Sequence, residues 1–153
     1  MREVWKPNVT VAAVVQRDGK FLLVEEETTE GIRFNQPAGH LEEGESLVDA
    51  VVRETLEETG YTFKPTFLLG IYQWPHPNKE ITYLRFAFGG ELLGHNPERT
   101  LDDGIIAARW LSLDEMRTNQ NLHRSPLILR CVEDWVEGIQ LPLSAITHYM
   151  KEI

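Results

Sequence analysis

Three glutamates, Glu54, Glu57 and Glu58, stand close together near the end of a segment with helical periodicity. Their spacing of i, i+3 and i+4 would place all three carboxylates on one face of a helix. Mutual repulsion and the negative helix C-terminus both disfavour such a cluster. A hard divalent cation, Mg²⁺ first and Mn²⁺ next, would offset both penalties by binding the carboxylate oxygens. The alternative is a solvated acidic helix face, and the spacing alone leaves both open.

The neighbours of the glutamates complete a loop–helix–loop unit. Apolar residues at helical spacing predict a helix over 45–59, with a glycine directly after its end. Gly39 leaves a proline-containing loop, and a residue without a side chain lets the backbone approach a ligand closely. Arg53 stands four residues before Glu57 and eight after Glu45, so it could pair with either and hold the carboxylates in place.

The rest of the chain supplies the elements that must position this unit. The Asp18-Gly19 pair between two apolar runs predicts a tight hairpin turn. Residues 28–39 predict a loop, because they include two glycines and a proline. Strands, a central helix, further strands and final helices together predict mixed α and β layers. The predicted strands are 9–16, 21–26, 67–74, 81–92 and 105–111, and the later helices start at Ser112 and Pro126.

Residues 39–61 resemble the Nudix box, G-x5-E-x7-R-E-U-x-E-E-x-G-U, where U is aliphatic. Every Gly, Glu and Arg of the pattern is in register, and the two departures, Thr55 and Tyr61, fall at U positions. Further segments are similar to a branch of bacterial Nudix phosphatases, namely Asn35-Gln36-Pro37-Ala38-Gly39, Gln73-Trp74, Leu84-Arg85-Phe86 and Arg124-Ser125-Pro126-Leu127. A motif with seven fixed residues in register is far more specific than a single glycine-rich loop.

The resemblance implies an α+β fold, the Nudix α/β/α sandwich, with a mixed sheet between helices. It also implies a Mg²⁺-dependent enzyme (Mn²⁺ being possible) that hydrolyses a diphosphate. Matched to the motif residue by residue, the metal ligands would be Glu54, Glu57, Glu58 and the Gly39 carbonyl. Arg53 would orient these carboxylates, while Glu45 and Gly60 would support the motif structurally.

Two sets of residues outside the glutamate cluster are further candidates for the site. The general base could be Glu54 or an acid of a later loop, Glu98, Asp102 or Asp103, among which Asp102 is favoured. Substrate contacts are expected from Gln36, His40, Trp74 and Arg85. The alternatives are that the Trp74 ring is buried in the core and that Arg85 pairs with a carboxylate inside the protein.

Composition narrows the class of protein and its partners. The chain has 153 residues, a length typical of one domain, and we expect a single Nudix domain over 1–153. Fifteen basic and 24 acidic residues leave a net charge of −9, which argues against binding to a nucleic-acid backbone. One cysteine excludes an internal disulfide, and no long apolar segment predicts a membrane span or signal peptide. We therefore expect a cytoplasmic monomer or homodimer whose partner is a small diphosphate.

The resemblance implies a phosphohydrolase that releases phosphate from nucleoside di- and triphosphates and from thiamin-pathway diphosphates. The latter are thiamin diphosphate and hydroxymethylpyrimidine diphosphate. One alternative within the family is a pyrophosphohydrolase of dinucleoside polyphosphates or ADP-sugars. An alternative of another class is a Nudix module that binds a metabolite without catalysis. The intact glutamate set argues for the enzyme, because a pure sensor need not keep a cluster suited to a metal.

Overall fold

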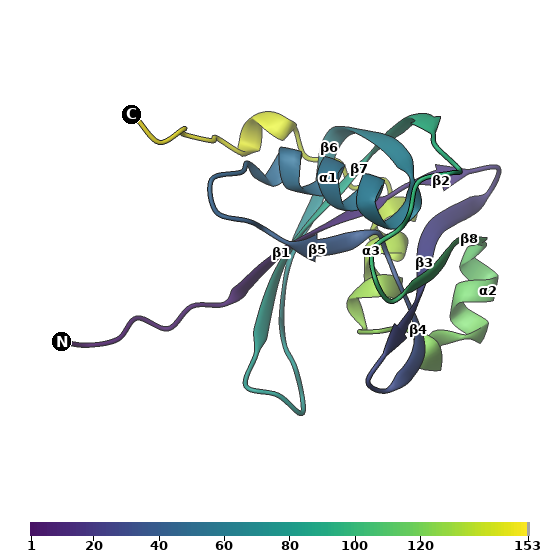
Figure 1. Ribbon diagram of the computed structural model, residues 1–153, viewed down its shortest axis with the longest axis horizontal. Coiled ribbons are helices and arrows are strands. Elements are labelled where there is room, and N and C mark those ends of the chain that lie inside the picture. The colour runs from purple at the N-terminus through teal and green to yellow at the C-terminus, as the bar shows by residue number, and fades with distance from the viewer. Residues whose placement is uncertain (153) are drawn as a thin grey trace.

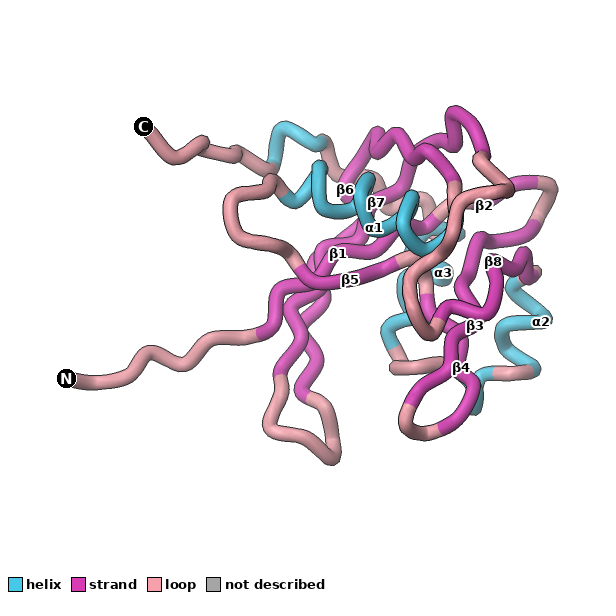
Figure 2. Tube along the Cα trace, in the orientation of Figure 1, coloured by secondary structure: helices cyan, strands magenta, loops and turns pink. Residues whose placement is uncertain are grey.

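The computed structural model describes residues 1–152, which form two β-sheets with helices packed against them (Figures 1 and 2). The strands are β1 Asn8–Val14, β2 Gln16–Arg17, β3 Lys20–Thr28, β4 Gly31–Asn35, β5 Ala38–His40, β6 Tyr61–Pro75, β7 Thr82–His95 and β8 Ile105–Leu111. The α-helices are α1 Leu47–Thr59, α2 Leu113–Thr118 and α3 Leu127–Val136, and two short 3₁₀ segments are Gln120–Leu122 and Leu143–Ala145. Within residues 1–152, no helix is both long and apolar enough to cross a membrane.

The larger sheet is mixed, with the strand order β5-β1-β7-β6. Strands β1 and β7 run parallel, whereas β5 and β6 pair antiparallel to their neighbours. In the second sheet β3 is central and pairs antiparallel with β2, β4 and β8. The hairpin that joins β6 and β7 projects from the body of the molecule (Figure 1). The predicted mixed α+β architecture is confirmed.

Alternating side chains of β1 divide the core into two layers. Val11 and Ala13 pack with Val51 of α1, in a cluster that also contains Phe88. Val14 points to the other face and belongs to a cluster with side chains of α2 and α3, including Met116, Ile128 and Val132. This alternation follows from the two-residue repeat of a strand. The mixed sheet therefore separates α1 from α3.

The prediction of a plain loop over residues 28–39 is wrong, because this segment contains β4 and β5. Strand β4 forms a hairpin with β3 in which Thr28 is paired with Gly31, whose φ is +98°. Neither strand has the run of apolar residues from which strands are recognised, and β4 is half-buried or exposed along its length. Pairing with β3 and β1 creates these strands, and pairing between distant segments is a tertiary property.

The local signals at turns and helix starts are confirmed. Asp18 and Gly19 have φ values of 52° and 76°, as a tight hairpin turn requires. Ser112, the predicted start of a later helix, is the N-cap of α2 and forms a capping box with Glu115. Helix α1 begins two residues later than predicted, because Ser46 is its N-cap and its side chain accepts a hydrogen bond from the Asp49 amide.

The two departures from the motif's aliphatic positions are accommodated by packing. The buried Thr55 hydroxyl donates to the Val51 carbonyl at 2.7 Å, so its polar atom is satisfied inside the helix. Tyr61 stacks on His95 with ring centroids 4.0 Å apart, and its hydroxyl accepts from Arg17 at 3.0 Å. Both residues therefore fill the positions of an aliphatic side chain while keeping their polar atoms hydrogen-bonded.

Gly60 ends α1 in a left-handed conformation, with φ of +76°. A Cβ at this position would lie 2.6 Å from the Asn96 carbonyl oxygen. We expect Gly60→Ala to destabilise the protein by about 2–3 kcal/mol, from left-handed strain and this contact together. The melting temperature should fall by roughly 5–10 °C. Gly94→Ala is the matched control, because a Cβ on Gly94 meets no atom within 4 Å; equal losses in the two variants would contradict the prediction.

Candidate active site

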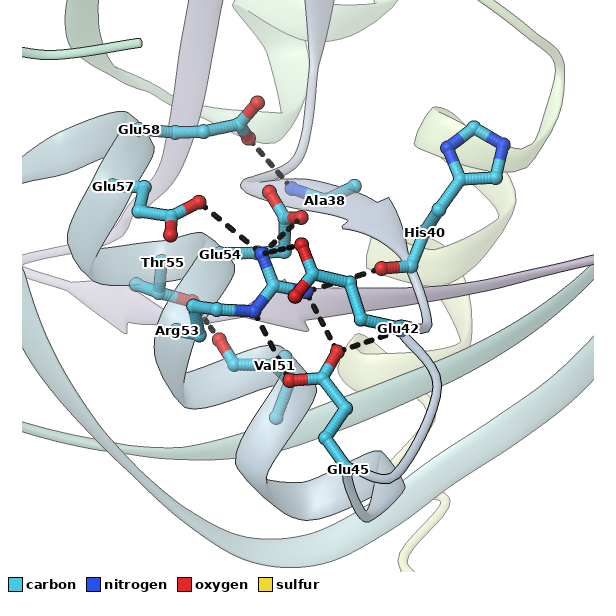
Figure 3. Close-up of polar contacts among 10 residues, drawn as sticks. All are labelled: Ala38, His40, Glu42, Glu45, Val51, Arg53, Glu54, Thr55, Glu57 and Glu58. Atoms are coloured by element: carbon cyan, nitrogen blue, oxygen red, sulfur yellow. Dashed lines mark hydrogen bonds and ion pairs between the residues drawn. The ribbon is translucent and has the colours of Figure 1, made fainter.

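The site lies where α1 crosses the short edge strand β5 (Figure 3). Glu54 is only 8% exposed, and its carboxylate lies directly over Gly39. A Cβ on Gly39 would overlap this carboxylate, so a glycine is required here by space rather than by backbone conformation. The glycine that begins the motif therefore leaves space at the edge of the sheet for a glutamate side chain of α1.

Arg53 forms the centre of the polar network in Figure 3. Its Nε and Nη2 donate to the two oxygens of Glu45 at 3.0 and 2.7 Å. Its Nη1 donates to Glu54 at 2.8 Å and to Glu57 at 3.2 Å, while Nη2 also donates to the His40 carbonyl at 3.1 Å. The hydrogen bonds with Arg53 hold the pKa of Glu45 below its usual value. One guanidinium thus links three carboxylates to β5, and the two pairings expected for Arg53 both occur.

Glu54, Glu57 and Asp102 bring one carboxylate oxygen each to within 4.8 Å of the others. Asp102 comes from the loop before β8, and its backbone amide donates to the Glu57 carbonyl at 3.1 Å. That bond ties the loop to the end of α1. Three converging carboxylates are a donor set of the kind that hard divalent cations bind. The residues therefore fit a metal site, although the third member is Asp102 rather than Glu58.

Glu58 is buried beside the cluster and takes a different partner. Its Oε1 accepts a hydrogen bond from the Ala38 amide at 2.8 Å (Figure 3). Burial raises the pKa of Glu58 to about 8, despite that bond, and burial also raises the pKa of Glu54 against the effect of Arg53. Carboxylates destabilised by desolvation gain from a nearby cation. This supports the fit of the site to a metal ion.

The hydrogen-bonding pattern of β5 contradicts the expectation that the Gly39 carbonyl faces the metal. Gly39 is opposite Val11 of β1. Two residues to either side, the Leu41 amide donates to the Val9 carbonyl and the Ala13 amide donates to the Pro37 carbonyl. In an antiparallel ladder every second residue bonds to the partner strand. Gly39 therefore turns its amide and carbonyl toward β1. The backbone groups that point away from β1, toward α1, belong to Ala38 and His40.

A pocket of about 410 Å³ extends from these carboxylates across the face of the sheet opposite α1. Glu54, Glu58 and the backbone of β5 border one end of it. Three of the four predicted substrate-contact residues, His40, Trp74 and Arg85, line it as well. The structure therefore brings two of the predicted metal-binding glutamates and three of the four predicted substrate-contact residues together in one concave region, as binding sites require.

Individual substrate candidates differ in what they offer to a ligand. The His40 imidazole points away from the glutamates (Figure 3), and His40 is one of the residues that line the pocket. Gln36 is completely buried and is hydrogen-bonded to Arg85 and to the Ile128 carbonyl, so its side chain cannot touch a ligand directly. Of the loop acids, Asp102 alone joins the carboxylate cluster among the described residues, whereas Glu98 and Asp103 are exposed outside it.

Ala38 and Thr10 are among the site residues that the sequence did not predict. Ala38 contributes backbone groups, which no side-chain pattern reports. Thr10 lines the pocket because it is in register with His40 on one side and Arg85 on the other. Register between distant strands has no local sequence signal. The one signal in the sequence was a single threonine in the apolar run of β1.

Replacing Gly39 with Ala tests the contact between β5 and Glu54. We expect kcat/KM to fall by about 10- to 100-fold, since the methyl group would displace the Glu54 carboxylate by about 1 Å or more. Thermal unfolding should change less than in Gly60→Ala, because the backbone of Gly39 is in an ordinary extended conformation. Hydrolysis assays and melting curves on the same preparations check this, with Gly94→Ala as control. Unchanged activity would mean that the Glu54 carboxylate can move without consequence.

Comparison with known proteins agrees with this geometry. A sequence profile of the NUDIX domain matches residues 5–131. Phosphatase NudJ of Escherichia coli (strain K12) is 43% identical over 143 residues, which cover 94% of this chain and 92% of NudJ. The resemblance to bacterial Nudix phosphatases inferred from the motifs is therefore confirmed over almost the whole chain.

Solved structures give the same result for the fold. A NUDIX hydrolase from Nitrosomonas europaea superimposes with a TM-score of 0.92 and 51% identity, over 94% of this chain and 98% of that one. A MutT NUDIX hydrolase from Burkholderia pseudomallei, at 22% identity, shares the fold with a TM-score of 0.71 over 85% of this chain and 98% of its own. With a domain profile and a relative that each match most of the sequence, this chain belongs to the Nudix family and is a Nudix hydrolase.

Proposed function

We propose that this protein is a Mg²⁺-dependent phosphohydrolase that releases orthophosphate from nucleoside di- and triphosphates and from thiamin-pathway diphosphates. The observation that carries the proposal is the convergence of Glu54, Glu57 and Asp102, because Glu54 also borders a pocket large enough for a nucleotide. The similarity to Phosphatase NudJ supports phosphate release as the reaction. Mg²⁺ suits a site built of oxygen ligands, and Mn²⁺ is the next choice.

The three carboxylates and the Ala38 carbonyl would hold the cation, with Glu58 as a further ligand at the pocket edge. A divalent cation held there would polarise the phosphate as a Lewis acid, lower the pKa of the attacking water and reverse the local sign of charge, so that a chain at −9 could accept a diphosphate. Without it, the acidic end of the pocket would repel the substrate.

The chain's own residues then position the reaction. Arg53 holds Glu54 and Glu57 in a fixed arrangement through its hydrogen bonds to both. Asp102 is the most exposed of the three carboxylates. With one oxygen on the cation, its other oxygen could take a proton from the attacking water and pass it to solvent, which makes Asp102 the candidate general base. Arg85 and Trp74 line the far part of the pocket, where the organic end of the substrate would lie.

The test is product identification on a substrate panel with and without millimolar Mg²⁺. The panel contains nucleoside di- and triphosphates, thiamin diphosphate, hydroxymethylpyrimidine diphosphate, ADP-ribose and a diadenosine polyphosphate. We expect Mg²⁺-dependent orthophosphate from the nucleotides and the thiamin-pathway compounds. Cleavage restricted to ADP-ribose or the dinucleotide would replace the proposal with internal pyrophosphate hydrolysis. Tight binding without any turnover would replace it with a metabolite-binding role.

A further inference from the structure

Arg85 is a buried cation without an acidic partner. It lies in the middle of β7 and is 6% exposed, yet it takes part in none of the ion pairs formed within residues 1–152. Its protein partners are neutral: Nη1 donates to Gln36 Oε1 at 2.8 Å and to Cys131 Sγ at 4.0 Å, and Nη2 donates to Asn35 Oδ1 at 2.9 Å. A buried charge without a counterion lowers the stability of the fold. Such a charge is therefore a candidate for binding a ligand.

The two amides fix the direction of the guanidinium. Gln36 is completely buried, and its Nε2 donates to the Ile128 carbonyl at 2.8 Å, so its oxygen must face Arg85. A guanidinium has five N–H groups in a rigid plane, and the two amide oxygens occupy only part of them. Since Arg85 lines the pocket, the remaining donors are available to a ligand there.

Arg85 comes from an inner strand of the sheet, not from the edge strand next to Glu54. His40 of β5, Thr10 of β1 and Arg85 of β7 are directly opposite one another in register and all line the pocket. Two strand spacings therefore lie between the edge strand and Arg85, a distance of about 10 Å.

An aromatic surface adjoins Arg85 on the same face of the sheet. Tyr83 is two residues before Arg85 and therefore points to the same side. Trp74 is opposite Tyr83 in the ladder, and the two rings stack with centroids 6.0 Å apart at an angle of 17°. Half-buried aromatic faces beside a directed set of N–H donors are suited to a flat ring whose edge carries hydrogen-bond acceptors.

We propose that Arg85 determines ring specificity by donating hydrogen bonds to a carbonyl oxygen on the substrate's base. This rests on the proposed function and narrows its substrate class. Hypoxanthine, guanine and uracil present a ring carbonyl to such a donor, whereas the equivalent position of adenine or cytosine carries an amino group, itself a donor. The pyrimidine of the thiamin pathway also carries an amino group. Nucleotides with a keto group at that position are thus preferred over adenine nucleotides and over thiamin-pathway diphosphates.

The test compares substrates that differ in that one group: IDP with ADP, and UDP with CDP, each in wild type, Arg85→Gln and Arg85→Lys. In the wild type we expect kcat/KM to favour the keto member of each pair by about 10- to 100-fold. In Arg85→Gln this ratio should fall to near one, largely through KM. Arg85→Lys keeps the charge but lacks the planar fork, so an intermediate ratio is expected. Lys64→Gln is the control, since it removes an exposed positive charge from neighbouring β6.

Several outcomes would overturn the inference. An equal loss for both members of a pair, with an unchanged ratio, would mean that Arg85 binds phosphate or only stabilises the fold. A wild type without any preference would have the same effect. Calorimetric binding of inosine and adenosine needs neither metal nor turnover, so it tests ring recognition even if the panel shows no hydrolysis. Failure of the enzyme proposal and failure of the Arg85 proposal therefore remain distinguishable.

Discussion

Glu57→Gln is expected to lower kcat/KM by about 100- to 1,000-fold in millimolar Mg²⁺. Glu57 is a member of the carboxylate cluster, and Gln has almost the same shape without the charge. Several kcal/mol of transition-state stabilisation come from a bound divalent cation, and each 1.4 kcal/mol corresponds to a tenfold change in rate. Raising the Mg²⁺ or Mn²⁺ concentration should recover part of the loss, because the first effect of the substitution is on metal affinity.

The control for this variant is Glu43→Gln, which removes one negative charge from an exposed position in the loop before α1. Steady-state rates across a metal titration, together with melting curves, separate loss of the cation from loss of the fold. Glu57 is partly exposed, so the melting temperature should change little or rise as repulsion with Glu54 and Asp102 is relieved. Full activity of Glu57→Gln at every metal concentration would refute the assignment of the cluster as the metal site.

Arg53→Lys is expected to lower kcat by about 10- to 100-fold while KM changes less. Lysine keeps the positive charge but offers a single point of donation in place of the planar fork. The guanidinium donates simultaneously to Glu45, Glu54 and Glu57 and to the His40 carbonyl, and no ammonium group can reproduce that set. The carboxylates would then no longer be held in place by one shared donor, and misplaced catalytic groups lower the reaction rate.

Arg109→Lys is the matched control, because Arg109 makes one ion pair with Glu25 at 3.3 Å and is half exposed. Such surface pairs contribute roughly 0–1 kcal/mol, so neither rate nor stability should change much. A double substitution, Arg53→Lys with Glu45→Gln, should cost little more activity than Arg53→Lys alone, since both residues act through one network. Independent, additive losses would mean that Glu45 acts on the site by another route.

The sequence was sufficient to identify the glutamate cluster of α1 because the motif is local. One segment of 23 residues contains the whole motif. It holds the three glutamates of α1, Arg53 with its partner Glu45, and the glycines at both ends. A helix converts sequence spacing into spatial proximity by a fixed rule. The same holds for the hairpin turn at Asp18-Gly19 and for the capping box of α2, which depend on residues only a few positions apart.

The other half of the site was decided by the tertiary structure. Asp102 is more than 40 positions from Glu57 in sequence, and a backbone hydrogen bond between the two segments brings its carboxylate to the cluster. Because of the register between β5 and β1, the Gly39 carbonyl faces β1 and the Ala38 carbonyl faces α1. The pairing of Arg85 with the amide oxygens of Asn35 and Gln36 likewise depends on contacts between segments far apart in sequence. Sequence spacing determines what lies together along one helix, whereas contacts between strands depend on pairing that no local pattern encodes.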